Sequence, residues 1–127
     1  MADNVIIWAD IPVVDLERAR KFYAHVTGLP VLSFPGMDDV AVIGDPTAGA
    51  PMYSIDLYVG GTPTAEGSTV YLNPYGDIDA AVARVREAGG EVLQDKQWMG
   101  DMVGWIAYFK DTEGNRLGFQ QSGPAPA

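Results

Sequence analysis

The sequence predicts an α+β fold built from two βαβββ modules in tandem. Hydrophobic patterning gives the order strand, helix and three strands, and the same order then occurs a second time. The two copies are related by an offset of 62 residues, which places Asp15 on Asp77 and Gly28 on Gly90. With 127 residues in total, each half is too small to bury its own core, so the two halves must share one.

The first module is predicted to span about residues 5–59. Val5–Ile11 is rich in branched and aromatic residues and is expected to form a strand that ends at Pro12. Asp15 then caps a helix that stops at Gly28. After a pair of short strands and a loop over residues 45–51, a last strand closes the module. These three strands are expected at Val31–Phe34, Val40–Ile43 and Met52–Val59.

The second module, about residues 68–121, follows a breaker-rich linker over residues 60–67. A strand is expected at Thr69–Asn73, followed by a helix that Asp77 caps and Gly89–Gly90 stops. The remaining strands are expected at Glu91–Leu93, Trp105–Lys110 and Arg116–Gln121, with a turn at Asp111–Asn115. Residues 122–127 are expected to be a loose tail, and residues 1–127 to form one domain.

Composition excludes several classes of function. The net charge of −9 and pI near 4.2 argue against binding to nucleic acid and to anionic membranes. The chain has no cysteine, so disulfides, zinc fingers and thiol nucleophiles are impossible. His25 is the one histidine, and helix-end stabilisation is its expected role. With no signal peptide or apolar span, a cytoplasmic protein is expected.

Four segments resemble one known family. DLERARKFYAHVTG, VYLN, DIDAAVARVREAGGEVL and DTEGNRLGF are similar to sequences of the vicinal oxygen chelate superfamily. That superfamily includes glyoxalase I, extradiol dioxygenases and bleomycin-resistance proteins, and the resemblance covers about residues 5–121. It implies a glyoxalase-like fold in which mixed sheets curl around a central cavity, in a homodimer.

The resemblance also implies four metal-ligand positions, and this chain departs from the family at three of them. Transferred onto this sequence, the positions fall on Trp8, Asp56, Val70 and Gly118. Only Asp56 can bind a metal, and one carboxylate does not hold a divalent ion against water. We therefore expect no metal and no other cofactor, and no metal-assisted isomerisation or oxygenation.

Strand alternation extends these positions into a candidate ligand-binding face. The expected cavity residues on the strands are Trp8, Asp10, Ser54, Asp56, Tyr58, Val70, Leu72, Tyr108, Arg116, Gly118 and Gln120. The opposite faces are apolar and are expected to pack on the helices. Asp10, Asp56 and Arg116 are the candidate catalytic residues. Two interpretations remain open: a ligand pocket, or a solvated face on which Arg116 pairs with an aspartate.

The segment WMGDMVGW, Trp98–Trp105, concentrates tryptophan and methionine among glycines. One interpretation is a mobile lid in which Trp98, Met102 and Trp105 close over a planar ligand. The other is a loop that folds onto a dimer partner.

These observations favour a metal-independent small-molecule-binding protein of the glyoxalase/bleomycin-resistance type. Its role would be to sequester a planar drug or metabolite, as in antibiotic resistance. One alternative is a metal-independent isomerase, lyase or cyclase that uses Asp10, Asp56 and Arg116 in the same cavity. A third is a stress or regulatory protein with a vestigial cavity. The expected partners are a small-molecule ligand and a second copy of the chain.

Overall fold

The computed structural model describes residues 8–44 and 55–127. Parts of two predicted strands, the segments 5–7 and 52–54, lie outside the described residues, as does the predicted loop at 45–51. Within the described residues, no helix is long and apolar enough to cross a membrane.

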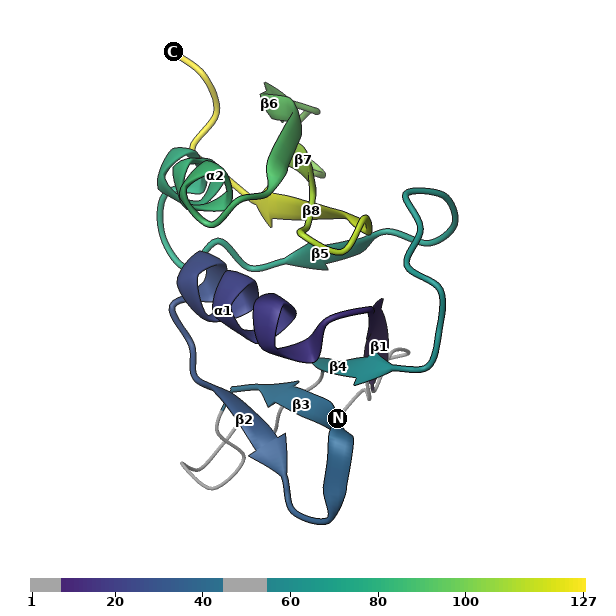
Figure 1. Cartoon of the computed structure of the whole chain (residues 1–127). Helices are drawn as coiled ribbons and strands as arrows, with labels where there is room; N and C mark the ends of the chain where they lie inside the picture. The colour runs from purple at the N-terminus through teal and green to yellow at the C-terminus, as the bar shows by residue number, and fades with distance from the viewer. Residues whose placement is uncertain (1–7, 45–54) are drawn as a thin grey trace, which may run out of the picture.

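Two βαβββ modules form the fold, which confirms the predicted α+β class (Figure 1). The elements of the first module are β1 (Ala9–Val13), α1 (Leu16–Thr27), β2 (Val31–Phe34), β3 (Met37–Ile43) and β4 (Ile55–Val59). Those of the second module are β5 (Val70–Leu72), α2 (Ile78–Glu87), β6 (Glu91–Trp98), β7 (Trp105–Lys110) and β8 (Arg116–Gln121).

Each module contributes one mixed four-stranded sheet, and the two strand orders are equivalent. Sheet 1 has the order β1-β4-β3-β2 and sheet 2 the order β5-β8-β7-β6. In each sheet the first and last strands of the module are parallel neighbours, and the other pairs are antiparallel. The sheets are therefore related as the sequence repeat predicts, and they do not join into a closed barrel.

Both helices begin at the predicted aspartates. The Asp15 side chain accepts a hydrogen bond from the Arg18 amide at 3.0 Å, and the Asp77 side chain accepts one from the Asp79 amide at 3.0 Å. At the end of α1, Gly28 takes a left-handed conformation with φ of 71°, which glycine adopts without the steric cost that a side chain brings.

Helix α1 packs against both modules, and Figure 1 shows it between sheet 1 and the second module. The rings of Phe22 on α1 and Phe109 on β7 have centroids 6.1 Å apart, and Phe109 stacks on Phe119 at 4.9 Å. One cluster of buried hydrophobic side chains contains residues of both modules. The halves therefore share apolar contacts, as their small size requires.

The turn between β7 and β8 joins the second module to the first. The buried Asp111 accepts a hydrogen bond from the Tyr23 hydroxyl of α1 at 2.5 Å. Asn115 donates to the Pro12 carbonyl at the end of β1 at 2.7 Å. Glu113 reaches the start of α1, where its oxygens accept hydrogen bonds from the Val14 and Asp15 amides at 2.8 Å each. The sequence predicted a turn at this position but not these contacts.

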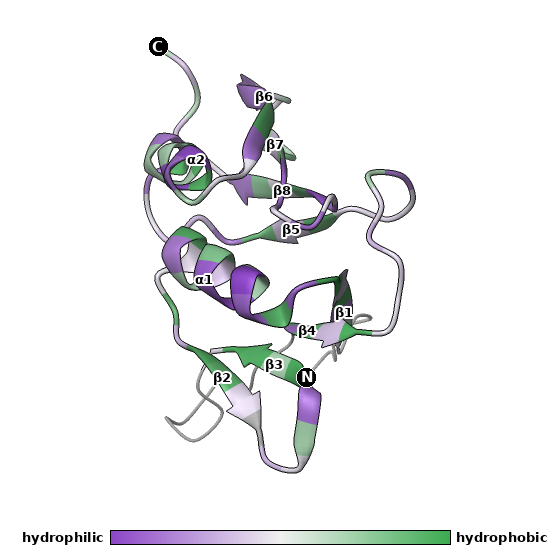
Figure 2. Ribbon diagram, in the orientation of Figure 1, coloured by the Kyte–Doolittle hydropathy of each residue, from purple (hydrophilic) through white to green (hydrophobic). Residues whose placement is uncertain are grey.

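Several strand boundaries differ from the prediction. Strand β1 continues through Pro12 to Val13, and β5 is shorter than expected. Strand β3 begins at Met37, and Figure 2 shows it changing from hydrophilic near its start to hydrophobic along its second half. Its first part is exposed, so the alternation that reveals a half-buried strand is missing there.

The largest boundary difference is β6, which continues to Trp98 instead of ending at Leu93. It pairs with β7 along its length, so Trp98 lies directly opposite Trp105. Residues 99–104 form the connecting turn, in which the Met99 amide donates to the Gly104 carbonyl at 2.8 Å. The Trp98–Trp105 segment is thus the end of a β-hairpin, held by backbone pairing.

The close packing of α1 against the second module predicts a cost for any side chain at Gly90. A Cβ there would lie 2.7 Å from a Phe22 ring carbon and 2.8 Å from both the Lys110 carbonyl oxygen and a Val85 methyl group. We expect Gly90→Ala to lower the free energy of unfolding by about 1–3 kcal/mol, as overpacking of a core does. Urea denaturation measures this, with Gly123→Ala as the control, because Gly123 lies in open surroundings. Equal stability of the two variants would contradict the packing described.

Candidate ligand-binding site

Sheet 1 carries a carboxyl pair on its outer face, which is the face turned away from α1. Ile11 and Leu57 on β1 and β4 point into the core, so Asp10 and Asp56, one residue earlier on each strand, point to the outer face. The two aspartates are direct partners in the parallel register. Trp8 lies beside them, and its indole N–H donates to Asp10 Oδ1 at 2.7 Å.

The two aspartates differ in burial and in acidity. Asp56 is 6% exposed, and burial together with the hydrogen bond and negative charge of Asp10 raises its pKa from 3.8 to about 7. Asp10 is exposed, and hydrogen bonds from Asp56 and Trp8 lower its pKa. The pair therefore holds one proton at neutral pH or just below it, predominantly on Asp56.

Apolar and aromatic side chains surround the pair. Val42 on β3 is opposite Asp56 in the register and is 2% exposed, which accounts for part of the dry environment of the carboxyl. Tyr58 lies two residues after Asp56 on the same face, and its ring packs over Gly61. The predicted cavity residue Ser54 lies outside the described residues. Trp8, Asp10, Asp56 and Tyr58 thus share one face, as the alternation argument requires.

The outer face of sheet 2 carries a pair of tyrosines. The hydroxyls of Tyr71 on β5 and Tyr108 on β7 are 2.8 Å apart, and Arg116 stands over the Tyr108 ring at 5.3 Å from its centroid. Arg116 also donates to Thr69 Oγ1 at 2.7 Å. Gly118 lies below the Tyr71 ring, where a Cβ would be 2.7 Å from a ring carbon. Sequence analysis placed Tyr108, Arg116 and Gly118 on this face but missed Tyr71.

The expected positions of Val70 and Leu72 were wrong. Leu72 is a member of the buried core and Val70 packs against it, so both point toward the helix side. The register pairs Tyr71 with Gly118, as it pairs Asp10 with Asp56. The first strand therefore repeats at 61 residues and the last strand at 62, so one extra residue lies between β5 and α2. The sequence analysis missed this insertion because the proline and the helix-capping aspartate both match at an offset of 62. A register shift of one residue moves every side chain of a strand to the opposite face of the sheet.

The predicted lid over a cavity is also corrected. Trp105 packs against the core, and its register partner Gln121 accepts a hydrogen bond from the Ile78 amide at the start of α2. Trp98 is the cross-strand partner of Trp105, so both lie on the α2 side of sheet 2. Met102 lies at the tip of the hairpin and is 98% exposed. These residues therefore do not cover the carboxyl pair of this chain.

Arg116 does not join the aspartates. Among the residues that the structure describes, no ion pair links Arg116 to Asp10 or Asp56, which belong to the other sheet. Gln120 lies on the same face of β8 as Arg116, four residues further along the strand, and donates to the Val103 carbonyl at 2.6 Å. The three candidate catalytic residues therefore form two separate groups within one chain.

The residues at the metal-ligand positions do not fit a divalent ion. Trp8 is a donor only, Gly118 has no side chain, and the corrected register places Thr69 where Trp8 lies in the first module. Asp56 is the one carboxylate at these positions, and a single carboxylate does not hold a divalent ion against water. Within residues 8–44 and 55–127, no three acidic or histidine side chains are close enough to hold a metal.

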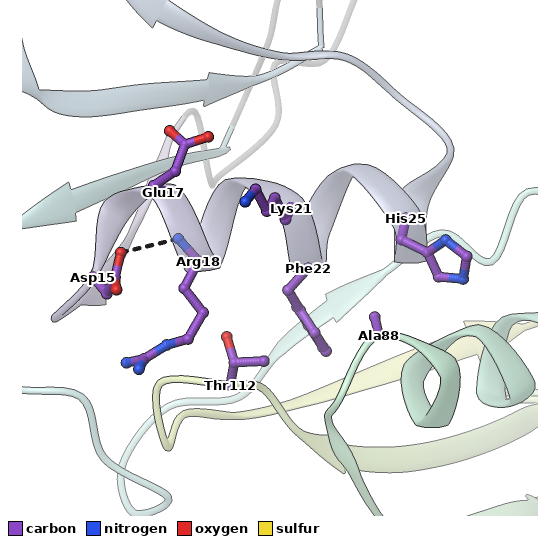
Figure 3. Close-up of a pocket in the computed structure, with 8 residues that line it drawn as sticks. All are labelled: Asp15, Glu17, Arg18, Lys21, Phe22, His25, Ala88 and Thr112. Carbon is purple, nitrogen blue, oxygen red and sulfur yellow. Dashed lines mark hydrogen bonds between the residues drawn. The ribbon is translucent and has the colours of Figure 1, made fainter.

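Among the described residues, two grooves lie away from the carboxyl pair. One, of about 410 Å³, lies along the junction of α1 and the second module, and Figure 3 shows Arg18 and Phe22 pointing across it toward Thr112 and Ala88. The other, of about 400 Å³, lies at the end of sheet 2 and includes Tyr71 and Gln120 among its lining residues.

Comparisons with known proteins agree with this arrangement of two βαβββ modules. A family model described as the Glyoxalase/Bleomycin resistance protein/Dioxygenase superfamily matches residues 5–119. The chain belongs to this superfamily. The superfamily member described here is 30% identical over 110 residues to a glyoxylase-like domain-containing protein from Didymella fabae, covering 84% of each chain.

Other proteins that are similar to this chain differ from it in length or have lower sequence identity to it. A Mycobacterium tuberculosis protein named "Putative glyoxylase CFP32" is 29% identical over 127 residues, which are 91% of this chain and 44% of that protein. The chain thus spans less than half the length of that relative. Among solved structures, a glyoxalase/bleomycin resistance protein from Streptomyces sp. CB03234 is 26% identical with a TM-score of 0.59, over 90% of this chain and 97% of that one. TnmS3 from the same organism, an antibiotic-binding protein, has the same fold, with a TM-score of 0.63 at 24% identity over 97% and 99%.

Proposed function

We propose that this protein binds a planar small molecule, without a metal, on the outer face of sheet 1. The observation that carries the proposal is the group formed by Trp8, Asp10 and Asp56, in which an exposed indole adjoins a carboxyl pair. Binding sites commonly combine apolar and aromatic walls with a few polar groups that orient the ligand. This group has that composition, and Trp8 and Asp56 are two of the four positions onto which the resemblance transfers the family's metal ligands.

The group favours some ligands over others. Trp8 is 41% exposed, and stacking or cation–π attraction on an indole ring contributes roughly 0.5–2 kcal/mol. A hydrogen bond to a charged carboxylate adds about 1.5–3 kcal/mol. Cations and planar hydrogen-bond donors should therefore bind better than anions, which the pair and the net charge of −9 repel.

Sheet 2 would supply a second part of the site. Its outer face presents the hydroxyls of Tyr71 and Tyr108 with the Arg116 guanidinium, which suit a ligand that carries hydrogen-bonding oxygens. We further propose that the chain acts as a homodimer, because within residues 8–44 and 55–127 each sheet ends in strands that pair on one side only. A drug or metabolite held in this way would be sequestered, and TnmS3 shows that one protein with this fold binds an antibiotic.

Catalysis is the second candidate function, and one observation favours it. Asp56 has a pKa of about 7, which is near the value that suits a general acid or base at neutral pH. A metal-independent isomerase, lyase or cyclase would use Asp56 to accept a proton from the substrate or donate one to it. Asp10 would carry the negative charge of the pair. Arg116 of the same chain would take no part, because it belongs to the other sheet.

Tryptophan fluorescence tests the binding proposal. We expect planar cationic compounds to quench the emission of the protein more than matched neutral and anionic compounds. Trp8→Ala should weaken binding of the best compound by about tenfold, the loss of one aromatic contact of roughly 1.4 kcal/mol. Trp98→Phe is the matched control, because Trp98 lies on the α2 side of sheet 2 and should leave affinity unchanged. Preferential binding of anions, or equal affinity in Trp8→Ala, would reject the site.

A further inference from the structure

We infer that the Asp10–Asp56 pair binds an organic monocation in exchange for a proton. The ligand class is a planar ring that carries an amidinium, guanidinium or ammonium group, whose N–H donors face the carboxyl oxygens. This inference rests on the proposed function. It adds the charge of the ligand and the pH dependence of its affinity.

The first support is the position of the two carboxyl groups. Asp10 and Asp56 are direct partners on neighbouring parallel strands, so their side chains leave the sheet side by side. Burial and the neighbouring Asp10 carboxyl raise the pKa of Asp56 to about 7, because two adjacent carboxylates repel each other when both are ionised. Adjacent like charges of this kind retain one proton between them until the pH is well above the usual range for an aspartate. The pair without ligand therefore carries about one negative charge.

The second support is an unsatisfied acceptor. Asp56 is 6% exposed, and among the described residues nothing hydrogen-bonds its Oδ1 atom. A buried polar atom without a partner costs about 1–3 kcal/mol, so native proteins rarely leave one. A ligand N–H placed against Oδ1 would satisfy this acceptor, and a positive charge on that ligand would favour loss of the shared proton.

The third support is that, in the part of the chain that the structure describes, no cationic side chain pairs with either aspartate. On β1, the neighbouring donor is the neutral Trp8 indole, and on β3 the facing residue is Val42. Asp38 and Asp39 at the start of β3 are exposed and bring no cation to the pair. No ion pair formed within residues 8–44 and 55–127 includes Asp10 or Asp56. The sequence segments 1–7 and 45–54 contain no Lys, Arg or His.

The exchange predicts a specific pH dependence. Because the cation competes with the shared proton, its apparent affinity should rise about tenfold per pH unit below about pH 7. Above that pH the pair is already fully ionised, and the affinity should become constant. A neutral ligand of the same shape brings no charge to displace the proton, so its affinity should change little over the same interval.

Benzamidine and benzamide provide the matched probes. Benzamidine stays cationic throughout this interval, and benzamide is its neutral counterpart. Isothermal titration calorimetry between about pH 5.5 and 8.5, in buffers of different ionisation enthalpy, gives the affinity and the number of protons released. We expect benzamidine to bind more tightly than benzamide and to release close to one proton per molecule below about pH 6.5.

Two substitutions complete the test. Asp56→Asn, which retains the side-chain shape, should abolish proton release and lower benzamidine affinity at pH 8 by about tenfold or more. Asp39→Asn changes an exposed carboxyl on β3 of the same sheet and should have neither effect. Circular dichroism establishes that each variant is folded, and Asp10→Asn provides a second variant of the pair with the same expected loss.

The outcomes separate this inference from the proposed function. Benzamidine binding without proton release, or with the same affinity at every pH, would overturn the inference. So would a complete lack of benzamidine binding. If benzamide binds as tightly as benzamidine and Trp8→Ala weakens both, the small-molecule site stands and the cation exchange is wrong.

Discussion

Replacement of Glu113 by alanine is expected to lower the free energy of unfolding by about 1–3 kcal/mol at neutral pH. The Glu113 side chain is 0% exposed and lies between the two modules. It accepts hydrogen bonds from Arg18 Nε at 2.7 Å and from the Val14 and Asp15 amides at 2.8 Å. Removing it deprives two backbone donors at the start of α1 of their acceptor and removes one of the links between that helix and the second module.

The lowered pKa of Glu113 indicates that its charged form is the stabilising one. Burial alone would raise its pKa, but hydrogen bonds from Arg18 and from the Asp15 and Val14 amides lower it from 4.5 to about 2. Because the folded pKa is below the ordinary value, this stabilisation is present above about pH 4.5 and is lost as the pH falls toward 2.

Urea denaturation at about pH 7 and pH 3 measures both effects. Glu113→Ala should lose most of its stability difference from the unmodified protein at the lower pH. Glu113→Gln, which keeps the shape but not the charge, should lose less than alanine at pH 7. Glu66→Ala is the control, because Glu66 is exposed in the linker. A loss that is the same at both pH values would show that packing, and not the ionised carboxylate, links the modules.

The second large effect is expected at Asp56. Asp56→Asn should raise the free energy of unfolding at about pH 8 by roughly 2–4 kcal/mol, because the amide avoids a buried negative charge beside Asp10. The folded pKa of Asp56, about 7, is above its ordinary value of 3.8. The folded protein therefore binds this proton more tightly than the unfolded chain does, so the stabilisation is full below about pH 4 and disappears as the pH rises through 7.

Denaturation curves from about pH 4 to pH 8.5 test this effect. The unmodified protein should become less stable across the interval by an amount that Asp56→Asn no longer shows. Asp39→Asn should retain the pH dependence of the unmodified protein, because Asp39 is exposed and lies outside the pair. Parallel pH profiles for the unmodified protein and Asp56→Asn would mean that Asp56 is ionised throughout and that the pair holds no proton.

Local sequence signals were sufficient for the elements and their order. Asp15 and Asp77 begin the helices, Gly28 ends the first, and apolar periodicity marks the buried side of each helix. These signals depend on side chains within a few residues of one another, so they can be read along the chain. The repeated order then implied two equivalent sheets, and the sheet orders agree with that implication.

The sequence was less informative where strands lack alternation. The start of β3 and the second half of β6 are largely exposed, so hydrophobicity does not mark them as strands. Backbone pairing with the neighbouring strands defines them instead. Pairing of β6 with β7 is also what removes Trp98 and Trp105 from the expected lid and places them on the α2 side.

By itself the sequence determined that this is a chain of two equivalent modules in which the family's metal ligands are replaced. Only the tertiary structure decided which side chains meet. It places Tyr71 on the outer face, because one extra residue before α2 shifts the strand register, and it brings Asp10 beside Asp56 across parallel strands. It also buries Asp56 against Val42 and thereby raises its pKa. Register and burial depend on contacts between residues far apart in the chain, and these exist only after the sheet has formed.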